Sequence, residues 1–149
     1  AVVSDAGTPC ISDPGYRLVN AANLSGINVI SVPGPSSVIA SISISGLPTD
    51  KFYFEGFLPK KKGRQKRLSY LSNIDGTIIL FESPKRLMKT LNDINKILGN
   101  RVVSLCKEIT KLHEKVVLDY LENIINKDSL NLKGEYNVLI SRKGYKLNE

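Results

Sequence analysis

The chain has 149 residues, of which 42% are hydrophobic and 23% charged, and it contains two cysteines, one histidine and no tryptophan. These proportions are ordinary for a globular protein and exclude disorder as the main state. No apolar run reaches the ~20 residues of a membrane-spanning helix. Two cysteines are too few for a disulfide scaffold or a four-thiolate zinc site, and we expect a reducing, cytoplasmic setting.

Charge is distributed unevenly along the chain. Residues 1–59 sum to −2, whereas residues 60–149 hold 19 basic and 10 acidic side chains and sum to +9. Six cations fall within residues 60–67, with no acid among them. Such a run suits a phosphate backbone, although a solvated surface loop explains it equally well.

The first part of the chain predicts a βαβ unit with two parallel strands. The expected elements are a buried strand over residues 1–4, a helix capped by Ser12 or Asp13 and ended by Gly26, and a strand over residues 28–32. Because a buried strand opens the chain directly, we expect a fragment whose earlier elements are missing. Small residues over 38–45 predict a helix, although three isoleucines leave a strand open.

The second part predicts alternating strands and helices. Strands are expected over residues 52–55, 77–81, 102–106, 116–118 and 135–141, with helices over 64–71, 84–98 and 120–125. We place a domain boundary after residue 47, which gives units over 1–47 and 48–142 and a frayed tail over 143–149. The fold class is therefore α/β, with a parallel-sheet first part and a mixed-sheet second part.

Two glycine-containing turns follow the predicted strands of the first part. Residues 5–9 (DAGTP) and 33–37 (PGPSS) would lie at the same edge of a parallel sheet, which is where open α/β sheets bind ligands. Glycine lets a ligand approach the backbone, and an acidic side chain can accept from a hydroxyl group. Taken singly, each turn is explained by an Asx turn or a helix cap.

Other polar groups carry weaker signals. Arg86 could pair with Glu82 across one helical turn or could face an anionic substrate. The single histidine, His113, is expected at the surface, and no metal site is predicted. Neither cysteine has a nearby histidine, so a thiol nucleophile is not expected.

Seven segments together resemble a known family, the ribosomal RNA small subunit methyltransferase I proteins of the tetrapyrrole-methylase-like superfamily. In chain order they are residues 1–16, 32–36, 46–50, 54–59, 81–84, 107–111 and 133–135. The resemblance implies a two-domain, S-adenosylmethionine-dependent enzyme of class III that methylates the ribose 2′-hydroxyl of a cytidine in 16S rRNA, at the decoding centre of the small ribosomal subunit. It also implies a homodimer, and the composition gives no reason to expect a membrane partner. This chain would hold the rear part of the N-terminal domain and the C-terminal domain, and the fragment alone could be inactive.

The same resemblance assigns site residues. The methyl donor would contact Asp5, Gly7, Thr8, Pro9, Ile11, Ser12, Pro35, Ser36, Ser37 and, from the second domain, Phe57. rRNA phosphates would contact Lys60, Lys61, Lys62, Arg64, Lys66, Arg67 and Arg86. No general base is assigned, and the candidates are Glu82, Lys107 and Glu108.

Two other functions stay open at this point. A related enzyme could methylate a tetrapyrrole or another small molecule, but it would not need the lysine run. A non-catalytic RNA-binding module would use the basic half equally well, but it would not bind a methyl donor.

Overall fold

The computed structural model describes residues 1–5, 7–127 and 133–147. The chain forms two compact units, Ala1–Ser37 and Val38–Glu149. Each unit is considered by itself, and the predicted boundary after residue 47 stays a prediction. Within the described residues, no helix has the length and apolar character needed to cross a membrane.

The first unit contains one helix, α1 (Tyr16–Leu24), among its described residues. The helix begins after Gly15, which is its N-cap residue, so neither Ser12 nor Asp13 caps it as predicted. Ser12 instead adopts a left-handed conformation with φ 59°. Residues 1–4 and 28–32 are not strands, and Val3 and Val32 are more than four-fifths exposed. The two strand predictions are therefore wrong. Apolar runs identify residues that favour a strand, but a strand also needs a neighbour for its backbone hydrogen bonds.

The second unit is built on a five-stranded mixed sheet. Its strands are β1 (Phe52–Phe57), β2 (Thr77–Glu82), β3 (Val102–Lys107), β4 (Lys115–Tyr120) and β5 (Tyr136–Ile140). They lie in the order β1-β2-β5-β3-β4, with β1 parallel to β2 and the other neighbours antiparallel. All five strand predictions for this part are confirmed, with ends that shift by one or two residues.

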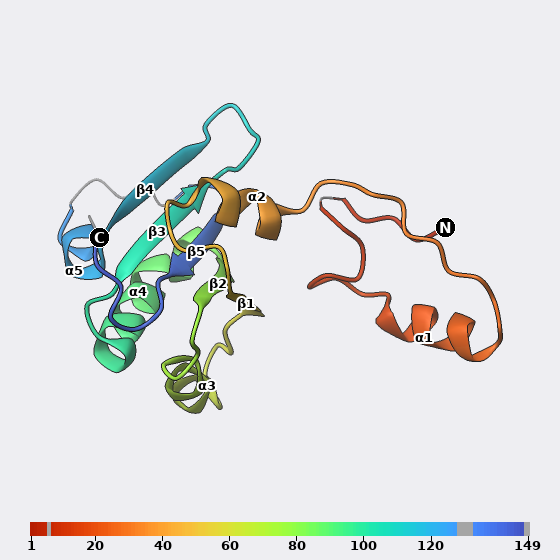
Figure 1. Ribbon diagram of the computed structural model, residues 1–149, viewed down its shortest axis with the longest axis horizontal. Coiled ribbons are helices and arrows are strands. Elements are labelled where there is room, and N and C mark those ends of the chain that lie inside the picture. The colour runs from red at the N-terminus through yellow and green to blue at the C-terminus, as the bar shows by residue number, and fades with distance from the viewer. Residues whose placement is uncertain (6, 128–132, 148–149) are drawn as a thin grey trace. The chain divides into compact units, whose positions relative to one another are not determined.

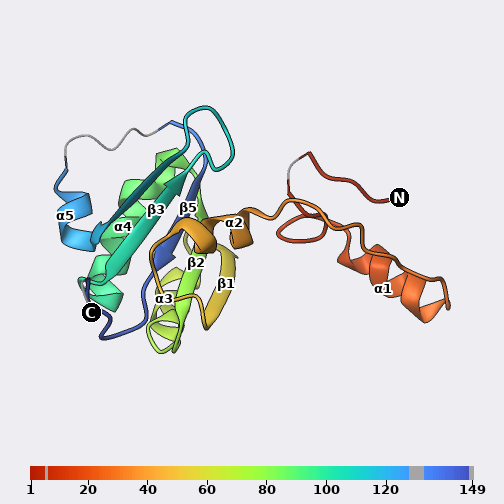
Figure 2. The same cartoon turned by 45° about the horizontal axis from the view of Figure 1, so that its top comes forward.

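Helices cover both faces of this sheet (Figures 1 and 2). The helices are α2 (Ser37–Ile44), α3 (Arg64–Leu71), α4 (Pro84–Leu98) and α5 (Leu121–Ile125). Leucines and isoleucines of α3, α4 and α5 form the larger core with one face of the sheet. Val38 and Ile42 of α2 pack on the opposite face, against Ile79 and Leu139. The helix prediction for residues 38–45 is thus confirmed over its strand alternative.

The chain after β5 returns to the α2 face of the sheet. Tyr145 and Leu147 pack against the α2 cluster, and the Tyr145 hydroxyl donates a hydrogen bond to the carbonyl oxygen of Gly46 at 3.4 Å. The prediction of fraying after Arg142 is wrong for these residues. Aromatic and leucine side chains in a short polar tail are the signal for such packing.

The topology gathers loops at one edge of the sheet. β2 and β3 are both antiparallel to β5, and β1 is parallel to β2. The carboxyl ends of β1, β2 and β3 therefore lie at the same edge. Glu82, Tyr136 and Lys107 form one row across it, since Tyr136 pairs with both of the others.

Candidate functional site

The two glycine-containing turns of the first unit contact each other. The Thr8 hydroxyl donates a hydrogen bond to the carbonyl oxygen of Pro35 at 3.0 Å, which joins residues 5–9 to residues 33–37. Gly7 adopts φ 72°, and a Cβ atom added there would meet nothing within 4 Å. A ligand can therefore reach the backbone of this turn next to the exposed side chain of Asp5.

The other residues assigned to the donor lie around these turns or in the second unit. Ile11 is 50% exposed, and Pro9 and Ser36 are half-buried, whereas Ser12, Pro35 and Ser37 are exposed. Phe57 ends β1 in the second unit, where its ring meets that of Phe81 edge to face with centroids 5.6 Å apart. Phe57 is 55% exposed, and its contact with a donor stays a prediction.

Four lysines project into solvent at the carboxyl end of β1. Lys60, Lys61 and Lys62 lie in the loop that leaves this strand, and Lys66 lies on α3. All four are exposed, and among the described residues no carboxylate forms an ion pair with any of them. Their charge is therefore available to an anionic partner.

Arg67 is bound within the second unit. Its Nε and Nη2 atoms donate to the two carboxylate oxygens of Glu55 at 2.6 and 2.5 Å, and Nη2 also donates to the Tyr53 hydroxyl at 2.7 Å. The guanidinium also lies over the Tyr70 ring, 4.7 Å from its centroid. Hydrogen bonding to Glu55 raises the pKa of Arg67, so its positive charge is locally neutralised and strongly held.

Arg64 and Arg86 are also held by protein groups. Arg64 is 6% exposed and pairs with Asp93 at 2.8 Å, and Arg86 Nε lies 3.4 Å from the carboxylate of Glu82. The structural alternative for Glu82 and Arg86 is therefore confirmed. Phosphate contacts by the three arginines stay predictions, and for Arg64 such a contact would require these bonds to break.

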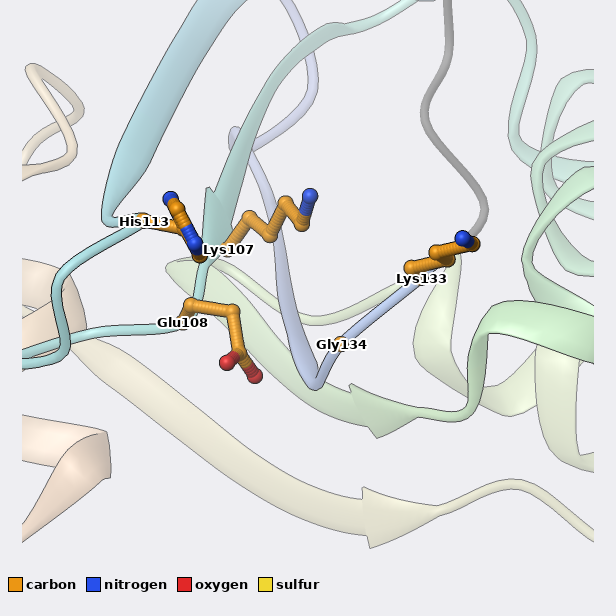
Figure 3. A pocket seen from close by; sticks show the side chains of 5 residues that line it. All are labelled: Lys107, Glu108, His113, Lys133 and Gly134. Carbon is orange, nitrogen blue, oxygen red and sulfur yellow. The ribbon is translucent and has the colours of Figure 1, made fainter.

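A shallow pocket of about 300 Å³ lies at the carboxyl end of β3 (Figure 3). Its lining comes from the end of β3, the loop that follows it and the segment before β5, and consists of Lys107, Glu108, His113, Lys133 and Gly134. Two of these five residues are lysines. The sheet edge that carries the lysine loop thus carries a second group of cationic side chains.

Glu108 connects the loop after β3 to the segment before β5 by hydrogen bonds. It adopts φ 48°, and its Oε1 atom accepts a hydrogen bond from the Glu135 backbone amide at 2.7 Å. The Lys111 ammonium donates to Oε1 of Glu108 at 3.3 Å and to Oε2 of Glu135 at 2.8 Å. The backbone hydrogen bond from Glu135, with Lys111 nearby, lowers the pKa of Glu108.

Substitution of Gly134 by alanine is expected to disrupt the hydrogen bonds of Glu108 with Glu135 and Lys111. Gly134 has φ 88°, and a Cβ atom there would lie 2.6 Å from Cγ of Glu108. Both the backbone strain and the collision oppose alanine, so we expect a loss of about 1–3 kcal/mol in the free energy of unfolding. Urea unfolding measures this loss, and Gly99→Ala, which has positive φ but open space, separates strain from collision.

The acid dependence of stability is expected to weaken in Glu108→Gln. A carboxyl group whose pKa is lowered on folding stabilises the protein above its unfolded pKa, and this contribution is lost as the pH falls through the folded pKa. The wild-type free energy of unfolding should therefore fall more steeply than that of the variant below about pH 4.5. Urea titrations between pH 3 and pH 7 measure both curves, with Asp75→Asn as an exposed-carboxyl control.

Two residues that organise the arginines were not predicted from the sequence. Thr90 is fully buried and Asp93 pairs with Arg64, and both lie on α4. Thr90 occupies a core position between Leu87 and Leu91. A polar residue at a buried position of an amphipathic helix is the signal that identifies such a group.

The chain is similar to a described family of enzymes. The family model for tetrapyrrole (corrin/porphyrin) methylases matches residues 1–125. Proteins named ribosomal RNA small subunit methyltransferase I are 45% identical over 147 residues in Thermotoga maritima and 44% identical over 149 residues in Halalkalibacterium halodurans. These matches cover 96% and 99% of this chain but 65% and 52% of the relatives. The chain thus spans about half to two thirds of their length.

Solved structures share the fold at lower identity. The methyltransferase CobJ aligns with a TM-score of 0.66 and 16% identity, over 92% of this chain and 62% of that chain. A diphthine synthase aligns with a TM-score of 0.67 and 16% identity, over 91% and 57%. The uroporphyrin-III C-methyl transferase of Thermus thermophilus, complexed with S-adenosyl homocysteine, aligns with a TM-score of 0.60 and 20% identity, over 89% and 62%.

Proposed function

This chain belongs to the tetrapyrrole (corrin/porphyrin) methylase family, and on that premise we propose that the protein methylates ribosomal RNA of the small subunit. The acceptor is the ribose 2′-hydroxyl of a cytidine in 16S rRNA, and the methyl donor is S-adenosylmethionine. The identity of about 45% with relatives named ribosomal RNA small subunit methyltransferase I carries the proposal.

The exposed lysines favour RNA over a small-molecule acceptor. An enzyme acting on a tetrapyrrole would not need this run of exposed lysines, whereas a phosphate backbone binds such cations with release of counterions. Lys60, Lys61, Lys62 and Lys66 lie together and are free of carboxylate partners among the described residues. The solved structures whose titles name a precorrin or uroporphyrin methyltransferase are only 18–20% identical to this chain.

The turns of the first unit suit the methyl donor. S-adenosylmethionine supplies an electrophilic methyl group, so the reaction needs no metal ion and no covalent enzyme intermediate. The Asp5 carboxylate can accept from a donor hydroxyl, and the backbone beside Gly7 can lie close to the ligand. The hydrogen bond from Thr8 to Pro35 holds the two turns in one arrangement, which serves the alignment of reacting atoms.

The acidic residues near the sheet edge are poor general bases. The Glu82 side chain is 1% exposed and its carboxylate accepts hydrogen bonds from Thr90 and from the Ser83 amide. Glu108 has a lowered pKa, which makes its carboxylate a weaker proton acceptor. Alignment of the ribose oxygen, the methyl carbon and the sulfur is therefore the main task proposed for the enzyme.

The same proposal includes the cellular compartment, the partner and the oligomeric state of the enzyme. We place the reaction in the cytoplasm, where the small ribosomal subunit is the partner, and we expect a homodimer without a membrane partner. Light scattering during gel filtration measures the oligomeric state directly.

A methyl-transfer assay tests the activity. The protein, expressed from its complete reading frame, is incubated with tritiated S-adenosylmethionine and small subunits that lack the modification, and the RNA is then hydrolysed with alkali. A 2′-O-methyl group blocks cleavage of the adjacent phosphodiester, so the expected product is a labelled dinucleotide. Label on mononucleotides would contradict ribose methylation. Donor binding without labelled RNA would favour a small-molecule acceptor, and failure to bind donor would favour a non-catalytic RNA-binding module.

A further inference from the structure

The backbone that leads into the lysine loop is held by two arginines. Arg86 Nη2 donates to the carbonyl oxygen of Leu58 at 2.8 Å, and Arg64 Nη1 donates to the next carbonyl, that of Pro59, at 3.1 Å. Lys60 follows immediately. A turn within the loop is closed by the Arg64 amide, which donates to the carbonyl oxygen of Lys61 at 3.2 Å.

A buried acid and a buried hydroxyl hold these arginines in turn. The Glu82 carboxylate pairs with Arg86 through Oε1 and accepts from the Thr90 hydroxyl at 2.6 Å through Oε2. The Thr90 hydroxyl oxygen accepts from Arg64 Nη2 at 2.8 Å, and Asp93 accepts from Arg64 Nε at 2.8 Å. One continuous network therefore joins the end of β2, the face of α4 and the base of the lysine loop.

Burial makes this network expensive to break. Glu82, Thr90 and Arg64 are 3%, 0% and 6% exposed, so a lost partner cannot be replaced freely by water. The two acids also neutralise the two arginines, which keeps these guanidinium groups inside the domain. The charge left at the surface is that of the lysines.

We propose that Glu82 and Thr90 are positioning residues that, through Arg64 and Arg86, fix the lysine loop in the conformation that meets a polyanion. A loop fixed in advance loses less conformational freedom when it binds, which raises affinity without adding a contact. What the loop binds rests on the proposed function, whereas the anchoring of the loop is a property of the free protein.

Trypsin tests the anchoring, because Lys60, Lys61 and Lys62 are themselves cleavage sites. The native protein is compared with Arg64→Lys, which keeps the charge but loses the three-way geometry, and with Thr90→Val, which removes one hydroxyl at similar volume. Cleavage in the loop is measured by mass spectrometry as a ratio to cleavage after Lys96 of α4. Arg142→Lys, an exposed arginine outside the network, is the matched control.

Both network variants should raise this ratio about tenfold, because proteolysis follows the population of the opened loop. The control should leave it unchanged. An unchanged ratio in the network variants would overturn the proposal. This includes the case in which cleavage in the loop and cleavage after Lys96 rise together, because the network would then stabilise the whole domain and not the loop in particular. If Arg64→Lys does not fold, Thr90→Val alone decides the result.

The same variants separate this inference from the proposed function. Titration with 16S rRNA should show weaker binding by Arg64→Lys, although its net charge is that of the native protein. A faster-cleaved loop with unchanged RNA affinity would keep the anchoring role in the free protein and would contradict its contribution to RNA binding, whereas phosphate binding by the lysines is tested separately by removing their charge.

Discussion

Replacement of Lys60, Lys61 and Lys62 by glutamine is expected to lower the affinity for 16S rRNA by about two orders of magnitude at 0.1 M salt. Each phosphate contact releases condensed counterions, and the slope of log K against log[salt] changes by about 0.7–0.9 per contact. Three lost contacts should therefore reduce the slope by about 2–3. Filter binding between 0.05 and 0.3 M salt, about the physiological range, measures both quantities.

The control removes the same charge from elsewhere on the second unit. Lys89, Lys96 and Lys143 are exposed and lie on α4 or after β5, outside the lysine loop and α3. Their triple glutamine variant should keep most of the affinity and the salt slope. Equal losses in both variants would mean that only net charge matters, and an unaltered slope in the first would remove the phosphate role of the loop.

The second unit could be predicted from sequence because its local signals agree with one another. In α4, Leu87, Leu91 and Ile94 recur at helical spacing, Pro84 occupies the first turn and Gly99 ends the helix with φ 83°. Each strand of this unit also has its pairing partner within the unit. In this unit, the residues that recur with apolar periodicity are therefore the ones that are buried.

The first unit shows why the same signals fail elsewhere. Residues 28–32 read as a strand by composition, yet Ile30 is 76% exposed and the segment is not paired as a strand. An apolar run indicates which residues would be buried in a sheet. It does not indicate which neighbouring strand would supply the backbone groups for its hydrogen bonds.

The sequence identifies the cations of residues 60–67 as a group, but it does not show which of them pair within the protein and which face solvent. In the sequence, the arginines and lysines of residues 60–67 are alike. In the structure, Arg64 meets Asp93 from 29 positions away and Arg67 meets Glu55 from 12 positions away. Long-range pairing cannot be read from local spacing, so arginines that hold the fold were grouped with lysines that face solvent.

The buried Arg101 side chain is expected to contribute strongly to the stability of the second unit. It is 7% exposed, and its guanidinium donates to the carbonyl oxygens of Ser72, Leu98 and Ser141 at 2.8, 3.3 and 3.2 Å. These carbonyls lie at the end of α3, at the end of α4 and after β5. Arg101→Met leaves all of them without this donor, and we expect the free energy of unfolding to fall by about 3 kcal/mol or more.

Urea unfolding of Arg101→Met, Arg101→Lys and the exposed control Arg142→Met measures this contribution. A single ammonium cannot span three helix and strand ends, so the lysine variant should also lose about 2 kcal/mol, whereas the control should lose less than about 0.5 kcal/mol. Burial lowers the pKa of Arg101, but a guanidinium stays protonated in proteins, so these losses should not change between pH 6 and pH 8, about the neutral range. A lysine variant as stable as the native protein would show that one carbonyl contact suffices. Because Ser72 caps the end of α3, loss of Arg101 should also loosen this helix, which carries Lys66. The Arg101 variants should therefore bind RNA more weakly as well as unfold more easily.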